Sequence, residues 1–154
     1  MTRYEPRAVV RRAGAGDEAA AWAIASEYFR SSEIIVFDDA ATFRTNLEEP
    51  ARFWIAEEGS DVVGCVAFRP RADVPRAGEV RRLYVRPTHR GAGLADALMN
   101  VVEDSAREEG FDTLYLDTHE TFAAAIALYE RRGYERIDRY NDNPLATIFM
   151  RRRL

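Results

Sequence analysis

The chain has 154 residues, a length that fits one domain, spanning 1–154, with a single hydrophobic core. Hydrophobic residues make up 47% and charged residues 31% of the sequence, an ordinary globular composition. The formal net charge of −4 argues against a broad nucleic-acid-binding surface, which usually carries a basic excess. The sequence contains neither an apolar run near the ~20 residues of a membrane-spanning helix nor a signal peptide, so we expect a cytoplasmic protein without membrane partners.

The single cysteine, Cys65, excludes an internal disulfide bond. It lies in the apolar run 62–68, where we expect a small buried side chain rather than a catalytic thiol. Asp117, His119 and Glu120 lie close together in sequence, but they lack the helical spacing of metal ligands and have no second cluster. We therefore predict no metal site.

Hydrophobic spacing and turn residues predict alternating strands and helices. The first half of the chain is expected to form a strand at 7–13, a helix to about residue 29, a short helix at 40–47, and a hairpin of strands at 52–57 and 61–69. A strand at 79–85, a helix at about 91–109 and a strand at 113–118 follow. The chain is then expected to form a helix to about residue 132 and two last strands, one after residue 133 and one over 147–153. Asp17 is the expected N-cap of the first helix, with Trp22, Ala25 and Phe29 on its apolar stripe. Both faces of the strand at 61–69 are apolar, so it is expected to be central. This order predicts an α/β sheet layered with helices.

The stretch VRPTHRGAGLADALM, residues 85–99, passes from strand to helix through Gly91, Ala92 and Gly93. Free N–H groups and the dipole at a helix N-terminus favour an anion, and glycine lets the backbone approach it. The stretch is therefore suited to hold phosphate, although a plain tight turn is an alternative. The dinucleotide fingerprint does not fit, because it needs glycine where Asp96 stands, and the P-loop ending G-K-[ST] is missing.

The segment EVRRLYVRPTHRGAGLADALM resembles the central motif of the GNAT superfamily of N-acetyltransferases, in which a strand is followed by [QR]-x-x-G-x-[GA] and a helix. Arg90, Gly93 and Ala95 match the three defined positions. Downstream, LYLDT and AAAIALYERRGYERI resemble the fifth strand of that family and the helix after it. The two matches together cover about residues 79–137, in the family's order.

This resemblance implies an α/β (α+β) fold with a mixed, mostly antiparallel sheet of six to seven strands, helices on both faces, and a splay between the fourth and fifth strands. It also implies acetyl-CoA as cosubstrate, with its pyrophosphate on the loop amides, its pantetheine arm along the fourth strand, and its acetyl carbonyl polarised by a backbone N–H at a bulge. The residues expected to bind it are Leu83, Tyr84, Val85, Arg90, Gly91, Ala92, Gly93, Leu94 and Ala95. Many members carry asparagine where this chain has Phe122, which we expect only to form a wall of the cofactor groove.

Acetyl transfer to an amine needs a proton acceptor for the amine and benefits from a proton donor for the departing thiolate. Tyr129 matches the family tyrosine beside the cofactor sulfur and is the candidate acid, although it also lies on an apolar helix stripe. Glu79 is the candidate base, because many relatives place a glutamate there; the alternative is an ordinary strand-end charge paired with Arg81. Strand alternation predicts that Leu83 and Val85 share the face of Glu79.

The acceptor site is expected in the parts that vary within the family, here about 29–43 and 140–144. Glu33, Asp38 and Asp39 could attract a cationic amine, although each could equally be a solvated loop residue.

The sequence therefore predicts an acetyl-CoA-dependent N-acetyltransferase that acts on a small-molecule primary amine by direct attack in a ternary complex. Amino acids, amine metabolites and amine antibiotics remain open as acceptors. Two alternatives remain, a protein lysine or N-terminal acetyltransferase and a non-catalytic coenzyme A sensor. Homodimers are common in the family, but the sequence carries no interface signature.

Overall fold

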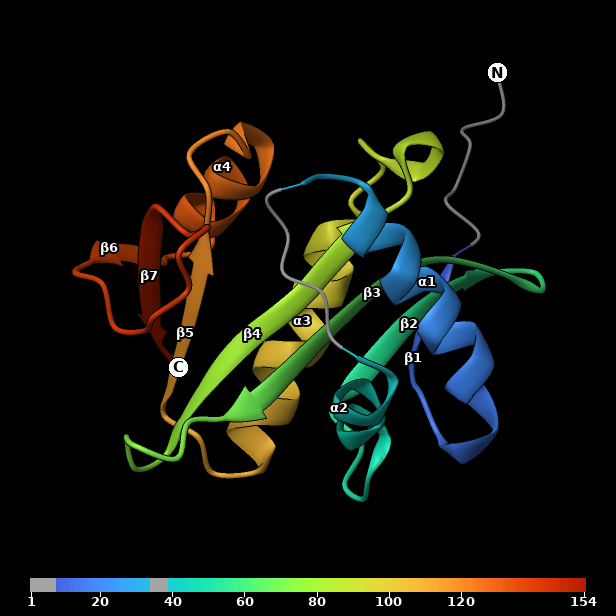
Figure 1. The fold of residues 1–154 in the computed structure, drawn as a ribbon, viewed down its shortest axis with the longest axis horizontal. Helices are drawn as coiled ribbons and strands as arrows, with labels where there is room; N and C mark the ends of the chain where they lie inside the picture. Colours follow the sequence, from blue (N-terminus) through green and yellow to red (C-terminus); the bar gives the residue numbers. More distant parts are fainter. Residues whose placement is uncertain (1–7, 34–38) are drawn as a thin grey trace.

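The computed structural model describes residues 8–33 and 39–154 as a single sheet with helices packed on it (Figure 1). The strands are β1 (Val9–Arg12), β2 (Phe53–Glu58), β3 (Asp61–Pro70), β4 (Ala77–Val85), β5 (Thr113–Thr118), β6 (Glu135–Ile137) and β7 (Ile148–Arg153). The helices are α1 (Glu18–Arg30), α2 (Ala40–Arg44), α3 (Leu94–Glu108) and α4 (Ala123–Arg131). The sequence predicted each of these elements, with strand bounds within a residue or two.

The sheet has seven strands in the order β1-β2-β3-β4-β5-β7-β6. β4 and β5 run parallel and every other neighbouring pair is antiparallel, so the prediction of a mixed, mostly antiparallel sheet is confirmed. β3 is paired on both edges, as expected from its two apolar faces.

Each face of the sheet has its own hydrophobic cluster. On one face, α1 and α2 cover a cluster that includes Phe29, Phe43, Cys65 and Tyr84. On the other face, α3 packs its apolar stripe, including Leu98, against the strands. Figure 1 shows α1 in front of the sheet and α3 behind it, which confirms helices on both faces. Cys65 is fully buried, as predicted, and burial raises the pKa of its thiol.

The start of α1 differs in one detail from the expected N-cap. Asp17 directly precedes the helix, but its side chain makes no hydrogen bond to the first turn. Instead it accepts the backbone N–H of Gly14 at 2.8 Å and a two-point ion pair from Arg11 at 2.7 and 2.8 Å. Asp17 itself belongs to a 3-10 turn, so its carboxylate faces back toward β1 rather than toward the helix.

The helix expected from about Gly91 begins three residues later, at Leu94. Gly91 and Gly93 have φ angles of 80° and 81°, in the left-handed region that glycine adopts without strain. These two positive angles prevent the α-helix from starting earlier, and the helix ends before Gly110, as predicted.

A bulge in β4 changes which of its residues share a face. Arg81 pairs with Ala67 and Tyr84 pairs with Cys65, so β4 has one more residue than β3 across this step. Arg82, inside the bulge, has a φ of 60°. The expected alternation is therefore wrong beyond residue 81: Tyr84, rather than Leu83 or Val85, continues the face of Glu79.

Candidate active site

The parallel pair of β4 and β5 separates along its length. The strands pair only from Ala77 opposite Thr113 to Glu79 opposite Tyr115, and beyond that point neither strand pairs with the other. Figure 1 shows the two strands diverging, with α4 beyond the open end of β5. This is the splay between the fourth and fifth strands that the sequence predicted.

A groove of about 1140 Å³ occupies this region. Its walls include the candidate acid and base, Tyr129 and Glu79. They also include eight of the nine residues expected to bind the cofactor and the expected wall residue: Leu83, Tyr84, Val85, Arg90, Gly91, Gly93, Leu94, Ala95 and Phe122. Ala92 belongs to the same loop but does not line the groove. The structure thus gathers residues from β4, the glycine loop, α3 and α4 around one cavity.

The glycine loop presents its backbone toward open space. A side chain built on Gly91 or Gly93 would have no neighbour within 4 Å among the described residues. Within those residues, no backbone group accepts a hydrogen bond from the amides of residues 91–96. Unpaired amides at a helix N-terminus are the groups that bind phosphate oxygens in proteins. The loop can therefore take an anion at the mouth of the groove.

The side chain of Arg90 holds this loop against the end of β4. Arg90 donates its Nε hydrogen to the carbonyl oxygen of Val85 at 2.9 Å, so the loop is tied back to the end of β4. The Arg90 guanidinium lies 5.9 Å from the ring centre of Tyr84. The arginine of the motif thus supports the loop with its side chain, while the loop amides remain exposed to a ligand.

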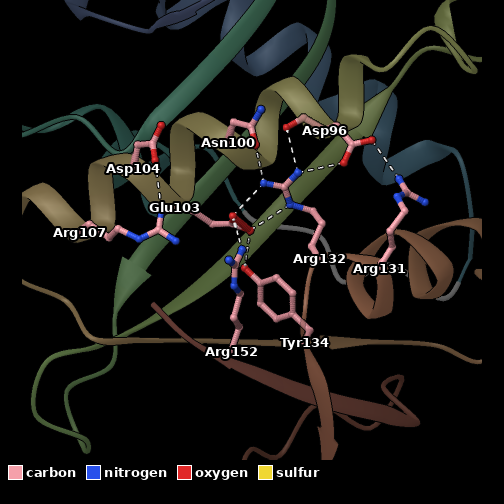
Figure 2. Close-up of polar contacts among 9 residues, drawn as sticks. All are labelled: Asp96, Asn100, Glu103, Asp104, Arg107, Arg131, Arg132, Tyr134 and Arg152. Atoms are coloured by element: carbon pink, nitrogen blue, oxygen red, sulfur yellow. Dashed lines mark hydrogen bonds and ion pairs between the residues drawn. The ribbon is translucent and has the colours of Figure 1, made fainter.

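Asp96, in the first turn of α3, is neutralised by the end of α4 (Figure 2). Arg131 and Arg132 each donate to its carboxylate at 2.9 Å. Burial opposes ionisation of Asp96, but these hydrogen bonds outweigh it and lower the pKa of the carboxyl. An unpaired carboxylate near a phosphate would repel it. The ion pairs with the two arginines offset the negative charge of Asp96.

Glu79 is 6% exposed and is held on both carboxylate oxygens. Oε1 accepts from Arg69 at 3.1 Å and lies 3.9 Å from Nε of Arg81. Oε2 accepts from the Tyr140 hydroxyl at 2.8 Å and lies 3.5 Å from the Asn141 amide nitrogen. Burial, together with the charge of Glu79, raises the pKa of Tyr140, so its hydroxyl stays protonated and donates. Several neighbouring side chains therefore hold Glu79 in place. One of them is Arg81, the partner expected if Glu79 were an ordinary strand-end charge.

Tyr129 is 7% exposed and lines the groove from α4. Burial is the main cause that raises the pKa of its phenol, so it carries its proton at neutral pH. Its ring packs at 5.8 Å against that of Tyr134, within the hydrophobic cluster on the α3 face. Tyr129 is therefore both a core residue and a groove residue, so the two interpretations of its sequence position are compatible.

Three groove residues that the sequence did not name individually as site residues make contacts that shape the site: Tyr28, Asp117 and Asn141. Tyr28, at the end of α1, packs its ring 5.7 Å from that of Tyr84, and burial raises its pKa to about 12. Asp117, near the end of β5, accepts from the Asn141 amide at 2.6 Å. Asn141 lies in the segment 140–144 that the sequence predicted for the acceptor, whereas Asp117 was considered only as a metal ligand. Their contact joins residues 24 positions apart. Only the end of β5 as a groove edge could have indicated Asp117.

The segments expected to bind the acceptor have mixed outcomes. Residues 141–144 line the groove, and Tyr140 supports it through Glu79. Asp39, in contrast, caps α2 by accepting the N–H of Thr42 at 2.8 Å, and it is not among the residues that line the groove. Phe29 is buried in the core, Glu33 is exposed outside the groove, and Asp38 lies outside the described residues.

Comparison with known proteins decides the family. The model of the acetyltransferase (GNAT) family matches residues 17–134, most of the chain. The chain belongs to the GNAT acetyltransferase family. The match spans α1, the glycine loop and α4, so it includes the elements that form the groove.

Relatives of this GNAT protein include a protein from Azospirillum brasilense named IAA acetyltransferase, which is 37% identical over 108 residues, covering 67% of this chain and 68% of that protein. A mouse protein named probable N-acetyltransferase family 8 member 5 is 36% identical over 108 residues, 68% of this chain. The chain spans about half the length of this mouse relative, 48%. Among solved structures, yncA of Salmonella typhimurium with its cofactor acetyl-CoA superposes with a TM-score of 0.77 at 21% identity, covering 96% of this chain and 94% of that one. This last likeness supports the fold.

No helix in the described part of the chain combines the length and apolarity needed to cross a membrane. Within residues 8–33 and 39–154, no three His, Cys, Asp or Glu side chains come together as metal ligands.

Proposed function

We propose that this GNAT protein transfers an acetyl group from acetyl-CoA to a primary amine of a small molecule. The observation that carries the proposal is the single groove that joins the open amides of the glycine loop to Glu79 and Tyr129. Such a groove can take the phosphate end of an elongated thioester at one end and an acceptor at the other. Family membership favours the same reaction class.

The cosubstrate would lie along the open edge of β4. Its pyrophosphate would accept hydrogen bonds from the amides of residues 91–96, which have no backbone partner in the described structure. Its pantetheine arm would extend along the unpaired edge of β4 at Leu83, Tyr84 and Val85, as an added strand does. The extra residue at Arg82 changes the backbone direction there, so an N–H at the bulge can face the acetyl carbonyl oxygen.

The reaction then needs no covalent enzyme intermediate. Glu79, directly or through water, takes one proton from the acceptor ammonium, and the nitrogen lone pair attacks the thioester carbonyl carbon. A C–N bond forms, and the tetrahedral intermediate collapses with cleavage of the C–S bond. Tyr129 donates its proton to the departing thiolate, and the proton still held by the new amide nitrogen restores the phenol. The products are the acetylated amine, coenzyme A and one proton released to solvent.

The experiment that tests this proposal measures thiol release from acetyl-CoA across amino acids, polyamines, aminoglycosides and short lysine peptides. We expect release with at least one class of small amine. Tyr129→Phe should lower kcat by roughly 10²- to 10⁴-fold while leaving coenzyme A binding intact, since the variant loses only the acidic proton. Tyr134→Phe is the matched control, because its hydroxyl bonds Glu103 at 3.3 Å and it is not among the groove residues.

Three other outcomes would redirect the assignment. Release only with peptides would favour a protein acetyltransferase. No release with any amine, but a raised melting temperature with coenzyme A, would favour a sensor. Full activity of Tyr129→Phe would show that another group protonates the thiolate.

A further inference from the structure

Two carboxylates from opposite sides of the splay meet in the groove through one amide. Asn141 points its Nδ2 atom at Oδ2 of Asp117, 2.6 Å away, and at Oε2 of Glu79, 3.5 Å away. Its other side-chain atom, Oδ1, accepts the backbone N–H of Asn143 at 3.1 Å. This third contact fixes the orientation of the amide, because the flipped side chain would face that N–H with its own N–H group. The nitrogen of Asn141 is therefore the atom shared by the two carboxylates.

The same geometry suits a cation with several N–H donors. Two negative charges in a partly buried groove repel each other, and a positive group between them stabilises both. Oε1 of Glu79 accepts from Arg69, whereas Oε2 accepts from the Tyr140 hydroxyl at 2.8 Å and lies near the Asn141 amide that also contacts Asp117. A carboxylate oxygen has more than one acceptor position, so Oε2 can take an additional donor. A primary ammonium has three N–H donors in a small volume and can bond both carboxylates at once.

We infer that Asp117 and Glu79 together bind the ammonium group of the acceptor, with Asn141 holding the two carboxylates at the distance that one nitrogen can span. This inference rests on the proposed function and specifies its acceptor. The acceptor is an aliphatic primary amine, which is charged at neutral pH and reaches the site as a cation. An arylamine is uncharged under the same conditions and lacks the third N–H donor.

Asp117 shares the groove with both the candidate acid and the candidate base. Burial raises the pKa of Tyr28, Tyr129 and Tyr140, and the charge of Asp117 adds to the increase in each. Asp117 therefore lies within electrostatic reach of the candidate acid, Tyr129, and of Tyr140, which bonds the candidate base. A nitrogen held by Asp117 and Glu79 would contact the candidate proton acceptor directly, in the same groove that the candidate proton donor Tyr129 lines.

The test is Asp117→Asn, which keeps the side-chain shape and an oxygen that can accept from Asn141 while removing the charge. We expect the KM for an aliphatic amine to rise about 10- to 100-fold, the usual worth of a hydrogen bond to a charged group, while the KM for acetyl-CoA stays within about twofold. Asp112→Asn is the matched control. Asp112 directly precedes the first residue of β5, is exposed, and is not among the groove residues. It should leave both constants unchanged.

Comparing benzylamine with aniline tests the acceptor class directly. The wild-type protein should favour benzylamine, and Asp117→Asn should narrow the preference. Equal use of the two amines by the wild-type protein, or an unchanged amine KM in Asp117→Asn, would overturn the inference.

Direct binding separates this inference from the proposed function. Isothermal titration calorimetry of benzylamine with the coenzyme A-bound protein measures amine binding and needs no turnover. Binding that Asp117→Asn weakens, without any thiol release, would support the ammonium site and contradict the acetyl transfer. Thiol release with a rate that Asp117→Asn does not change would support the transfer and contradict the site. If no aliphatic amine binds the wild-type protein, the inference is wrong.

Discussion

At the scale of single residues, removal of the Tyr140 hydroxyl tests whether its hydrogen bond holds Glu79 in position. The ring is fixed independently of the hydroxyl, because it packs against Tyr115 at 5.2 Å and under the Arg71 guanidinium at 4.5 Å. Tyr140→Phe therefore removes the 2.8 Å hydrogen bond to Glu79 and keeps the packing. We expect kcat/KM for the amine to fall about 10-fold, since hydrogen bonds to charged groups contribute roughly 1.5–3 kcal/mol.

Separate kinetics for the two substrates distinguish positioning from general damage in Tyr140→Phe. The carboxylate proposed to face the acceptor loses one donor, so the loss should appear in kcat/KM for the amine. An equal loss of kcat/KM for the amine and for acetyl-CoA would contradict a role in holding Glu79. The KM for acetyl-CoA should stay the same, because the hydroxyl is directed at Glu79 rather than at the β4 edge.

Asp17 predicts a pH dependence of stability. Hydrogen bonds from Arg11 and from the backbone of Gly14 lower the pKa of Asp17 from 3.8 to about 2. A lowered folded-state pKa means that the stabilisation is fully present above the unfolded value and is lost as pH falls through the folded value. Asp17→Asn should therefore be less stable than wild type near pH 7, and the difference should vanish between about pH 4 and pH 2.

The size of the Asp17 effect is limited by solvent. The Arg11 side chain is 41% exposed, so we expect about 1 kcal/mol or less near pH 7, measured by thermal unfolding across pH. Asp104→Asn is the control, because its carboxylate is 70% exposed in an i,i+3 pair with Arg107. A stability difference for Asp17→Asn that persists at pH 2 would show that the loss is not electrostatic.

At the scale of elements, the loop between β4 and α3 depends on glycine for two reasons. The φ of 81° at Gly93 disfavours any side chain by roughly 1–2 kcal/mol, and a leucine there would occupy open space at the groove that Gly93 lines. Gly93→Leu should therefore abolish the rise in melting temperature that coenzyme A causes. Gly110→Leu is the matched control, since Gly110 has a φ of 87° and equally open surroundings but lies after α3. Retained coenzyme A binding in Gly93→Leu would contradict the role of the loop.

At the scale of the whole molecule, a polar network joins α3 to the C-terminal strands (Figure 2). Glu103 of α3 is 2% exposed and accepts from Arg132 at 2.8 Å and from Arg152 of β7 at 2.6 Å. Arg132 also reaches Asn100 at 2.6 Å and Asp96 at 2.9 Å. This network connects the first turn of α3, which follows the glycine loop, to the end of α4 and to β7 across the back of the splay.

Removal of Arg132 should destabilise the fold as a whole. Arg132→Ala leaves Glu103 buried with Arg152 as its remaining arginine, so we expect a loss of about 2–3 kcal/mol, somewhat below that of a fully orphaned charge. Urea unfolding measures it. Arg131→Ala, which removes a single ion pair with Asp96 from a side chain 61% exposed, should cost under 1 kcal/mol. Equal losses in the two variants would show that burial does not determine the effect.

Most of the helices and strands could be predicted because their signals are local. The apolar residues on both of its faces predicted β3 as an interior strand, and α3 ends before Gly110 as expected. The start of α3 was predicted too early, since sequence spacing alone does not show that Gly91 and Gly93 adopt positive φ angles. The bulge at Arg82 was also invisible, because it arises from pairing with β3 rather than from β4 itself.

The sequence by itself determined the family motif, the glycine loop and the candidate pair Glu79 and Tyr129, because each depends on residue types at short, fixed spacing. Only the tertiary structure decided what surrounds that pair. Asn141, 62 residues from Glu79 in the chain, reaches it from the segment before β7 and joins it to Asp117, 38 residues from Glu79, across the splay of β4 from β5. Contacts of this kind depend on how the strands pair and where they separate, so residue spacing along the chain cannot reveal them.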